Sequence, residues 1–138
     1  MIELLKKLML TPGVSGREEK IRQVIEDEIK PYADEVTTDN MGNLIARKKG
    51  EGKKIMLCAH MDEIGFFVSY IEDSGLVRIT PVGGFNYIAA AYSGVTFENG
   101  VRGVIIPDGE DPSKKDKYYI DIGTASRKQT EKKLSLGE

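Results

Sequence analysis

The chain has 138 residues, 40% hydrophobic and 30% charged, a composition typical of a globular protein with one domain, or with one small domain and part of another. The formal net charge is −2 and acidic and basic residues are interspersed, which excludes a basic surface for nucleic acid, so no nucleic-acid partner is expected. No apolar run approaches the roughly 20 residues that cross a bilayer, and the single cysteine, Cys58, fits a reducing compartment, so we expect a cytoplasmic protein with no membrane partner.

Two helices are expected at the start of the chain. Residues 1–11 alternate apolar and charged side chains at helical spacing, which predicts an amphipathic helix that stops at the proline-glycine pair after it. Ser15 and Glu18 have the Ser-x-x-Glu spacing of a capping box, which predicts a second helix from about Gly16. Apolar residues then recur every three or four positions until Pro31, so one face of this helix should pack on a core.

Strands are expected from residue 35 onward. Two short runs on either side of the turn at residues 39–42 predict a hairpin, and residues 55–59 are apolar at every position. Such a run predicts a central strand buried on both faces, with Cys58 as a small core residue. Turn residues separate further strands that we expect at residues 64–72, 76–82, 95–97, 101–106 and 118–122. A last short helix, capped by Thr124, is expected over residues 124–134.

Helices therefore come first and strands dominate later. This order predicts an α/β protein with a domain boundary near residue 68, between residues 1–68 and residues 69–138. The polar stretch at residues 107–117 is expected to be a loop.

The residues most able to carry chemistry follow the apolar run at residues 55–59. On a strand, His60 and Asp62 would point to the same side, about 6–7 Å apart. A neutral imidazole suits zinc, and a nearby carboxylate can orient the ring. Taken alone, His-x-Asp is a weak signal, and a histidine at a strand end beside an ordinary loop aspartate is its more common explanation. A glycosidase pair of Asp62 and Glu63 is disfavoured, because neighbours on an extended chain point to opposite faces.

Several stretches, in the same order along the chain, make the pattern more specific. They are TPGVSG at 11–16, DNMGNLIA at 39–46, AHMDEIG at 59–65 and PVGG at 81–84, with looser matches at 101–105 and 120–123. In these stretches the chain resembles the amino-terminal part of the tetrahedral, self-assembling, metal-dependent aminopeptidases, or glutamyl aminopeptidases, some of which are labelled endoglucanases.

The resemblance implies a fold, a chemistry and an assembly. Residues 1–68 would form part of a zinc-exopeptidase-like α/β domain, and residues 69–138 an incomplete small β-barrel domain inserted in it. Two divalent ions, zinc or cobalt, would activate a water that cleaves the amino-terminal residue from a peptide substrate. The resemblance makes His60 a ligand of one ion and gives Asp62 the catalytic task of supporting it. It also implies a homo-oligomer.

Most of the site that this resemblance implies is missing from the chain. In the family, the general-base glutamate, the remaining carboxylate ligands and a second histidine come from further along, and His60 is the only histidine here. A catalytic zinc needs about three protein ligands. We therefore expect at most a partial metal site and no activity from the chain alone. The alternative from another class is a non-catalytic module for assembly or peptide binding. Substrate-binding residues and the role of residues 85–93 stay open.

Overall fold

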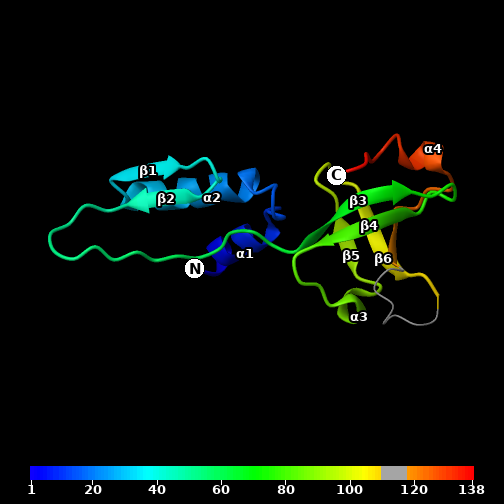
Figure 1. Cartoon of the computed structure of the whole chain (residues 1–138), viewed down its shortest axis with the longest axis horizontal. Helices are drawn as coiled ribbons and strands as arrows, with labels where there is room; N and C mark the ends of the chain where they lie inside the picture. Colours follow the sequence, from blue (N-terminus) through cyan, green and yellow to red (C-terminus); the bar gives the residue numbers. More distant parts are fainter. Residues whose placement is uncertain (110–117) are drawn as a thin grey trace. The chain divides into compact units, whose positions relative to one another are not determined.

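The computed structural model describes residues 1–109 and 118–138 and has a mixed α/β fold (Figure 1). It divides the chain into two compact units, Met1–Glu63 and Ile64–Glu138, called unit 1 and unit 2 below. The division falls after Glu63, five residues before the boundary expected near residue 68, and the strand at residues 65–71 lies wholly in unit 2. The expected loop at residues 107–117 lies mostly outside the described residues.

Both expected helices of unit 1 are confirmed. Helix α1 spans Ile2–Leu10, and helix α2 spans Glu19–Ile29 and continues into a short 3-10 turn, Lys30–Tyr32, that contains the expected proline. Helix α1 buries none of its residues, and Ile21 of α2 is the one hydrophobic residue of unit 1 that is buried. Unit 1 therefore has a very small hydrophobic core.

The capping box predicted from Ser15 and Glu18 is wrong. Helix α2 begins after Glu18 and has no side-chain cap. The Glu18 carboxylate accepts a hydrogen bond from the Gly16 N–H at 2.7 Å, while the Ser15 hydroxyl donates to the carboxylate of Asp62. A charge-assisted bond to a carboxylate is stronger than a bond to a neutral backbone group, so the hydroxyl is committed elsewhere.

The hairpin of unit 1 is confirmed. Strands β1, Glu35–Thr38, and β2, Leu44–Arg47, pair antiparallel and lie alongside α2 (Figure 1). The side chain of Asp39 holds the turn by accepting hydrogen bonds from the N–H groups of Met41 and Asn43, each at 2.9 Å. A hydrogen bond from the Asn43 side chain, and secondly these backbone bonds, lower the pKa of the Asp39 carboxyl. An aspartate at this position is the usual means of closing such a turn.

The strand predicted at residues 55–59 is wrong, and so is the prediction that Cys58 lies in a core. The segment is not in a strand, and the side chains of Ile55, Met56 and Leu57 are at least 85% exposed. Cys58 is exposed as well. An apolar strand buried on both faces needs paired neighbours and helices over it. The described residues of this chain supply neither around this segment.

Unit 2 is built on one antiparallel sheet, and all of its predicted strands are confirmed. The order across the sheet is β3-β4-β7-β6-β5, and β3–β4 and β5–β6 are the two expected hairpins. The bounds are Gly65–Ile71 for β3, Val77–Val82 for β4, Gly94–Thr96 for β5, Arg102–Pro107 for β6 and Tyr118–Asp121 for β7. Strand β7 lies between the two hairpins and joins them into one sheet.

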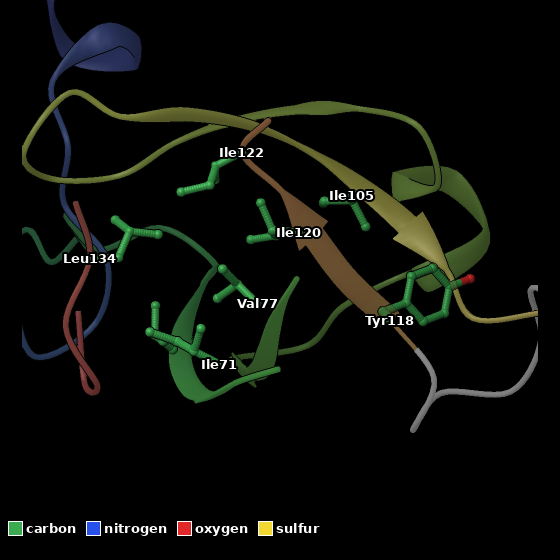
Figure 2. Packing of buried hydrophobic residues seen from close by; sticks show 8 residues of the cluster. Ile71, Val77, Ile105, Tyr118, Ile120, Ile122 and Leu134 are labelled. Atoms are coloured by element: carbon green, nitrogen blue, oxygen red, sulfur yellow. The ribbon is translucent and has the colours of Figure 1, made fainter. Parts of the chain in front are cut away.

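The core of unit 2 lies on one side of this sheet. Figure 2 shows apolar side chains from β3, β4, β6, β7 and the carboxy-terminal segment pointing toward one another. Val77 is 0% exposed and Ile120 2%, and Leu134 contributes from outside the sheet. Each large apolar side chain that is fully buried stabilises a fold by about 1.5–3 kcal/mol, so this cluster makes unit 2 the better packed of the two units.

The expected helix over residues 124–134 is shorter, and its predicted cap is wrong. Helix α4 spans Arg127–Thr130, and its first residue follows Ser126. The hydroxyl of Thr124 instead lies 2.5 Å from that of Thr130. Thr130 is fully buried and donates to the Gly75 carbonyl at 2.8 Å. These hydroxyls therefore bind the β3–β4 turn rather than the start of the helix.

Two elements of unit 2 were not predicted. A short helix, α3, spans Tyr87–Ala90. The last residues of the chain form backbone hydrogen bonds with β3: the Gly137 N–H donates to the Val68 carbonyl and the Val68 N–H to the Glu138 carbonyl, both at 2.9 Å. They meet β3 beside a register shift that follows Val68. These bonds satisfy the backbone N–H and carbonyl groups of Val68, on the outer side of an edge strand.

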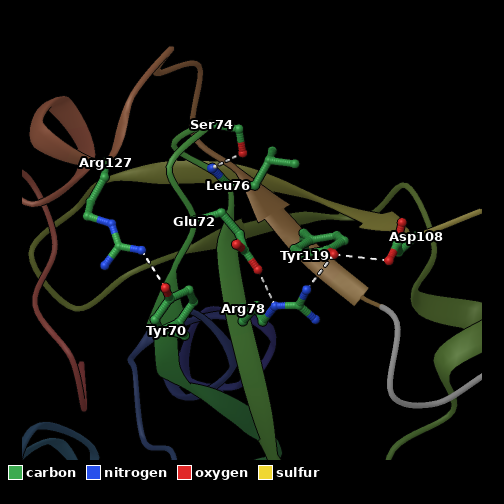
Figure 3. A network of polar contacts seen from close by, with 8 residues as sticks. All are labelled: Tyr70, Glu72, Ser74, Leu76, Arg78, Asp108, Tyr119 and Arg127. Atoms are coloured by element: carbon green, nitrogen blue, oxygen red, sulfur yellow. Dashed lines mark hydrogen bonds and ion pairs between the residues drawn. The ribbon is translucent and has the colours of Figure 1, made fainter.

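A polar network lies over β4 and β7 (Figure 3). Arg78 forms an ion pair with Glu72, donates to the Tyr119 hydroxyl at 2.8 Å and stacks on the Tyr119 ring. The same hydroxyl donates to Asp108 at 3.0 Å. Burial, and secondly the bond to Asp108, raise the pKa of Tyr119 above its usual value of about 10.

This shift predicts that unit 2 loses stability at high pH. Because the pKa of the folded tyrosine is raised, the stability it contributes is present below pH about 10 and is lost as pH rises through the higher folded pKa. In a Tyr119→Phe variant the free energy of unfolding should decline less above pH 10 than in the wild-type chain. The measurement is urea denaturation at a series of pH values. The exposed Tyr32 gives the matched control, because a Tyr32→Phe variant should keep the full decline. An equal decline in all three proteins would contradict the assignment.

Candidate metal-ligand site

Two stretches far apart in the sequence meet in unit 1. The Glu63 N–H donates to the Gly13 carbonyl at 2.8 Å, and the Gly13 N–H donates to the Glu63 carboxylate at 3.1 Å. Val14 and Glu63 form an isolated parallel bridge. The loop that precedes α2 is therefore attached to the segment that carries His60 and Asp62.

Gly13 is what allows the loop to lie on α2. It is buried, and a Cβ added there would come within 2.6 Å of the Ile21 Cγ2 atom. Real Cβ atoms do not approach other atoms this closely, so only glycine fits without a shift of the helix or the loop. The one buried hydrophobic residue of unit 1 thus sets the position of the loop.

Ser15 connects this loop to Asp62. Its hydroxyl donates to the Oδ2 atom of Asp62 at 2.5 Å, and Ser15 is half-buried. This hydrogen bond, and secondly the one with His60, keep the pKa of the Asp62 carboxyl below its usual value. Asp62 is therefore an anion at neutral pH.

The same aspartate holds the ring of His60. The Nδ1 atom of His60 lies 3.0 Å from the Asp62 carbonyl oxygen and 3.2 Å from its Oδ1 atom. Both partners can only accept, so in the neutral ring Nδ1 carries the proton and the lone pair is on Nε2. The His60 side chain is 86% exposed, so Nε2 is accessible to a ligand.

The structure brings together the two residues singled out from the sequence, but not as expected. They were expected on one side of a strand, whereas residues 59–62 lie in no strand and the ring turns back onto Asp62. Sequence reasoning missed Ser15 and Gly13 as members of the site. The signal was present in the TPGVSG stretch, which was interpreted as a turn followed by a cap.

The chemistry of these donors fits one metal ligand rather than a whole site. An imidazole that binds a metal through one nitrogen usually donates its other N–H to a carboxylate or a carbonyl, as His60 does to Asp62. Among residues 1–109 and 118–138, no group of three or more histidine, cysteine, aspartate or glutamate side chains is placed to hold an ion.

The described part of the chain also has no helix long and apolar enough to cross a membrane.

Comparison with known proteins identifies the family. Residues 42–138 match the family described as M42 glutamyl aminopeptidase. The chain is 46% identical to an Acetivibrio thermocellus protein that is provisionally named an aminopeptidase. The match covers 100% of this chain and 43% of that protein. The chain belongs to the M42 glutamyl aminopeptidase family, whose members are metal-dependent.

Solved structures of peptidases share the fold. An aminopeptidase from the archaeon Desulfurococcus kamchatkensis superposes with a TM-score of 0.89 at 34% identity, covering 99% of this chain and 41% of the other. The Pyrococcus horikoshii TET1 peptidase, which can assemble into a tetrahedron or a large octahedral shell, has a TM-score of 0.82 at 36% identity and matches 99% of this chain and 44% of its own. The chain thus spans about two fifths of the length of each of these three relatives.

Proposed function

We propose that this chain contributes His60 to the metal centre of an aminopeptidase and that Asp62 orients the ring. The observation that carries the proposal is the contact of the His60 Nδ1 atom with Asp62, which leaves Nε2 as the ligand atom. A pair of divalent ions, zinc or cobalt, would polarise the peptide carbonyl and activate the attacking water when bound. The general base and the remaining ligands would come from residues other than those described.

Within this proposal, His60 and Asp62 each have one task. His60 supplies a neutral nitrogen, and Asp62 keeps the Nδ1 proton in place and raises the basicity of the Nε2 atom. Unit 1 would form the opening part of the peptidase domain, and unit 2 would form a small inserted β-barrel domain, with the boundary before β3 instead of at residue 68. The substrate would be the amino-terminal residue of a peptide, in a cytoplasmic homo-oligomer.

The experiment tests the chain in place of the matching amino-terminal part of a longer relative. In a chimera, it replaces the matching part of the Pyrococcus horikoshii TET1 peptidase, to which it is 36% identical. Release of p-nitroaniline from leucine and glutamate p-nitroanilides is measured with zinc or cobalt, and with EDTA as a control. We expect metal-dependent turnover that His60→Ala abolishes and Asp62→Asn reduces by about 10–100-fold.

The control for this chimera is its assembly, measured by size-exclusion chromatography. A chimera that assembles and turns over substrate equally well with His60→Ala would show that His60 is not a ligand. The isolated chain, assayed in the same way, should release no p-nitroaniline, because a catalytic metal needs about three protein ligands.

A non-catalytic module is the second candidate. It is favoured by the absence of any cluster of three ligand side chains among the described residues. In that case the chain would assemble or bind peptides equally well after His60→Ala and in EDTA. Sedimentation of the chain and of its His60→Ala variant, with and without zinc, separates the two candidates.

A further inference from the structure

We propose that Ser15 is a positioning residue that fixes the Asp62 carboxylate and, through it, the metal-binding tautomer of His60. This inference rests on the proposed function, since it concerns how the proposed ligand is held. It extends the site to a residue from a different stretch of the chain, in the loop before α2.

The two oxygens of the Asp62 carboxylate have different partners. Oδ1 lies 3.2 Å from the His60 Nδ1 atom, and Oδ2 accepts from the Ser15 hydroxyl at 2.5 Å. The torsion that turns a carboxylate is broad and roughly two-fold, so a bond to one oxygen alone defines the group poorly. Bonds at both oxygens fix its plane. The hydroxyl of Ser15 therefore determines whether Oδ1 faces the imidazole.

The serine is itself held by its neighbours. The Arg17 N–H donates to the Val14 carbonyl at 2.8 Å, and the Gly16 N–H donates to the Glu18 carboxylate at 2.7 Å, so the backbone turns on both sides of Ser15. The exchange of hydrogen bonds between Gly13 and Glu63 attaches this turn to the segment that bears the site.

These contacts also separate a positioning role from a merely structural one. The hydrogen bonds of Gly13 with the N–H and the side-chain carboxylate of Glu63 hold the loop in place without Ser15. Removing the hydroxyl should therefore leave the loop attached and free only the carboxylate. Once Oδ2 loses its donor, the carboxylate can turn away from Nδ1, and the Asp62 carbonyl oxygen, 3.0 Å away, is then the one acceptor left of the two that hold the Nδ1 proton. With one acceptor instead of two, part of the population should move its proton to Nε2, the tautomer that an unrestrained imidazole prefers in water.

The single histidine of the sequence makes this directly measurable. With the full chain labelled with ¹⁵N-histidine, the ring nitrogen shifts above pH 8 report the tautomer of His60 alone. We expect mainly Nδ1–H in the wild-type chain, a shift toward Nε2–H in Ser15→Ala, and recovery of Nδ1–H in Ser15→Thr, which keeps a hydroxyl. Glu18→Ala is the matched control, because it loosens the same loop without touching Asp62.

Zinc titration of the same samples gives a second measurement, followed through the His60 ring signals. We expect Ser15→Ala to weaken zinc binding by on the order of tenfold or less, since removing a direct partner of a ligand typically costs 10–100-fold and Ser15 acts one bond further away. Equal tautomer populations in the wild-type chain and Ser15→Ala, or a wild-type ring in the Nε2–H form, would overturn the proposal.

The two proposals fail in different ways. If the wild-type chain shows the Nδ1–H tautomer but zinc leaves the ring signals unchanged, the ligand role of His60 is wrong while the role of Ser15 is still decided by the tautomers. If Ser15→Ala does not fold, Ser15→Cys replaces it, because a thiol is a much weaker donor of similar shape. A Cys variant with the wild-type tautomer would then overturn the proposal.

Discussion

Replacing Gly75 by alanine should lower the free energy of unfolding of unit 2 by about 3 kcal/mol or more. Gly75 lies in the β3–β4 turn at a φ of +94°, and a Cβ there would meet the Thr124 carbonyl oxygen at 2.8 Å and the Ser126 nitrogen at 2.9 Å. The left-handed conformation alone costs alanine about 1–2 kcal/mol, and forcing a methyl group into a packed site costs about 1–3 kcal/mol more.

The contacting atoms explain why the cost is large. Both belong to the backbone between β7 and α4, and the Gly75 carbonyl also accepts from the buried Thr130 hydroxyl at 2.8 Å. A shift that accommodates the methyl group would break this bond, at a further cost of about 0.5–1.5 kcal/mol.

Gly100 provides the matched control. It lies in the β5–β6 turn at a φ of +89°, and no atom would lie within 4 Å of its Cβ. Gly100→Ala should therefore cost only the conformational part, about 1–2 kcal/mol. The measurement is urea denaturation followed by circular dichroism and tyrosine fluorescence, since the chain has no tryptophan. Equal losses in the two variants would show that the contacts with residues 124 and 126 do not constrain the turn.

The strands of unit 2 could be predicted because their signals are local. The pairing of β3 with β4 follows from two apolar runs on either side of a turn that contains Gly75, so the two strands are neighbours in the sequence. The core that they form can be inferred in the same way, since side chains such as Val77 and Ile120 lie on one face of their strands.

Residues 55–59 could not be predicted in this way, because burial of a strand depends on the elements that cover it. The run has the composition of a central strand, yet Leu57 is 93% exposed. The sequence pattern indicates what such a segment packs against in a complete sheet. It does not indicate whether this chain itself supplies those neighbours.

The site was only half predictable for a different reason. His60 and Asp62 are close in sequence, so their contact could be expected, although the strand geometry assumed for it is wrong. Ser15 donates to a residue far along the chain, and its local pattern with Glu18 equally fits a helix cap. A hydroxyl that can serve either partner is assigned by the tertiary fold, which the local sequence does not contain.

Replacing Gly13 by alanine should disturb the site through packing alone. The new Cβ would lie 2.6 Å from the Ile21 Cγ2 atom and 3.0 Å from its Cβ atom. Ile21 is 4% exposed and β-branched, so it has little freedom to move aside. Overpacking of this kind costs about 1–3 kcal/mol, which is large for a unit that buries one hydrophobic residue.

The expected result is local. Hydrogen exchange of the amides in α2 and the loop at residues 13–16 should accelerate by about 5–150-fold if 1–3 kcal/mol is lost, while the amides of unit 2 keep their protection. The His60 ring should shift toward the Nε2–H tautomer, because the loop that carries Ser15 is displaced. Gly50→Ala is the control, since a Cβ at Gly50 has nothing within 4 Å.

A double-mutant cycle with Ile21→Ala tests the cause. Ile21→Ala removes the Cγ2 atom that the new methyl group would meet, so the double variant should lose less stability than the sum of the two single losses. Additive losses would mean that the Gly13 methyl group acts elsewhere, for example on the Met61 carbonyl oxygen, which would lie 3.5 Å from it. A coupled loss, together with the altered tautomer, would show that the packing of the loop on α2 determines the orientation of His60.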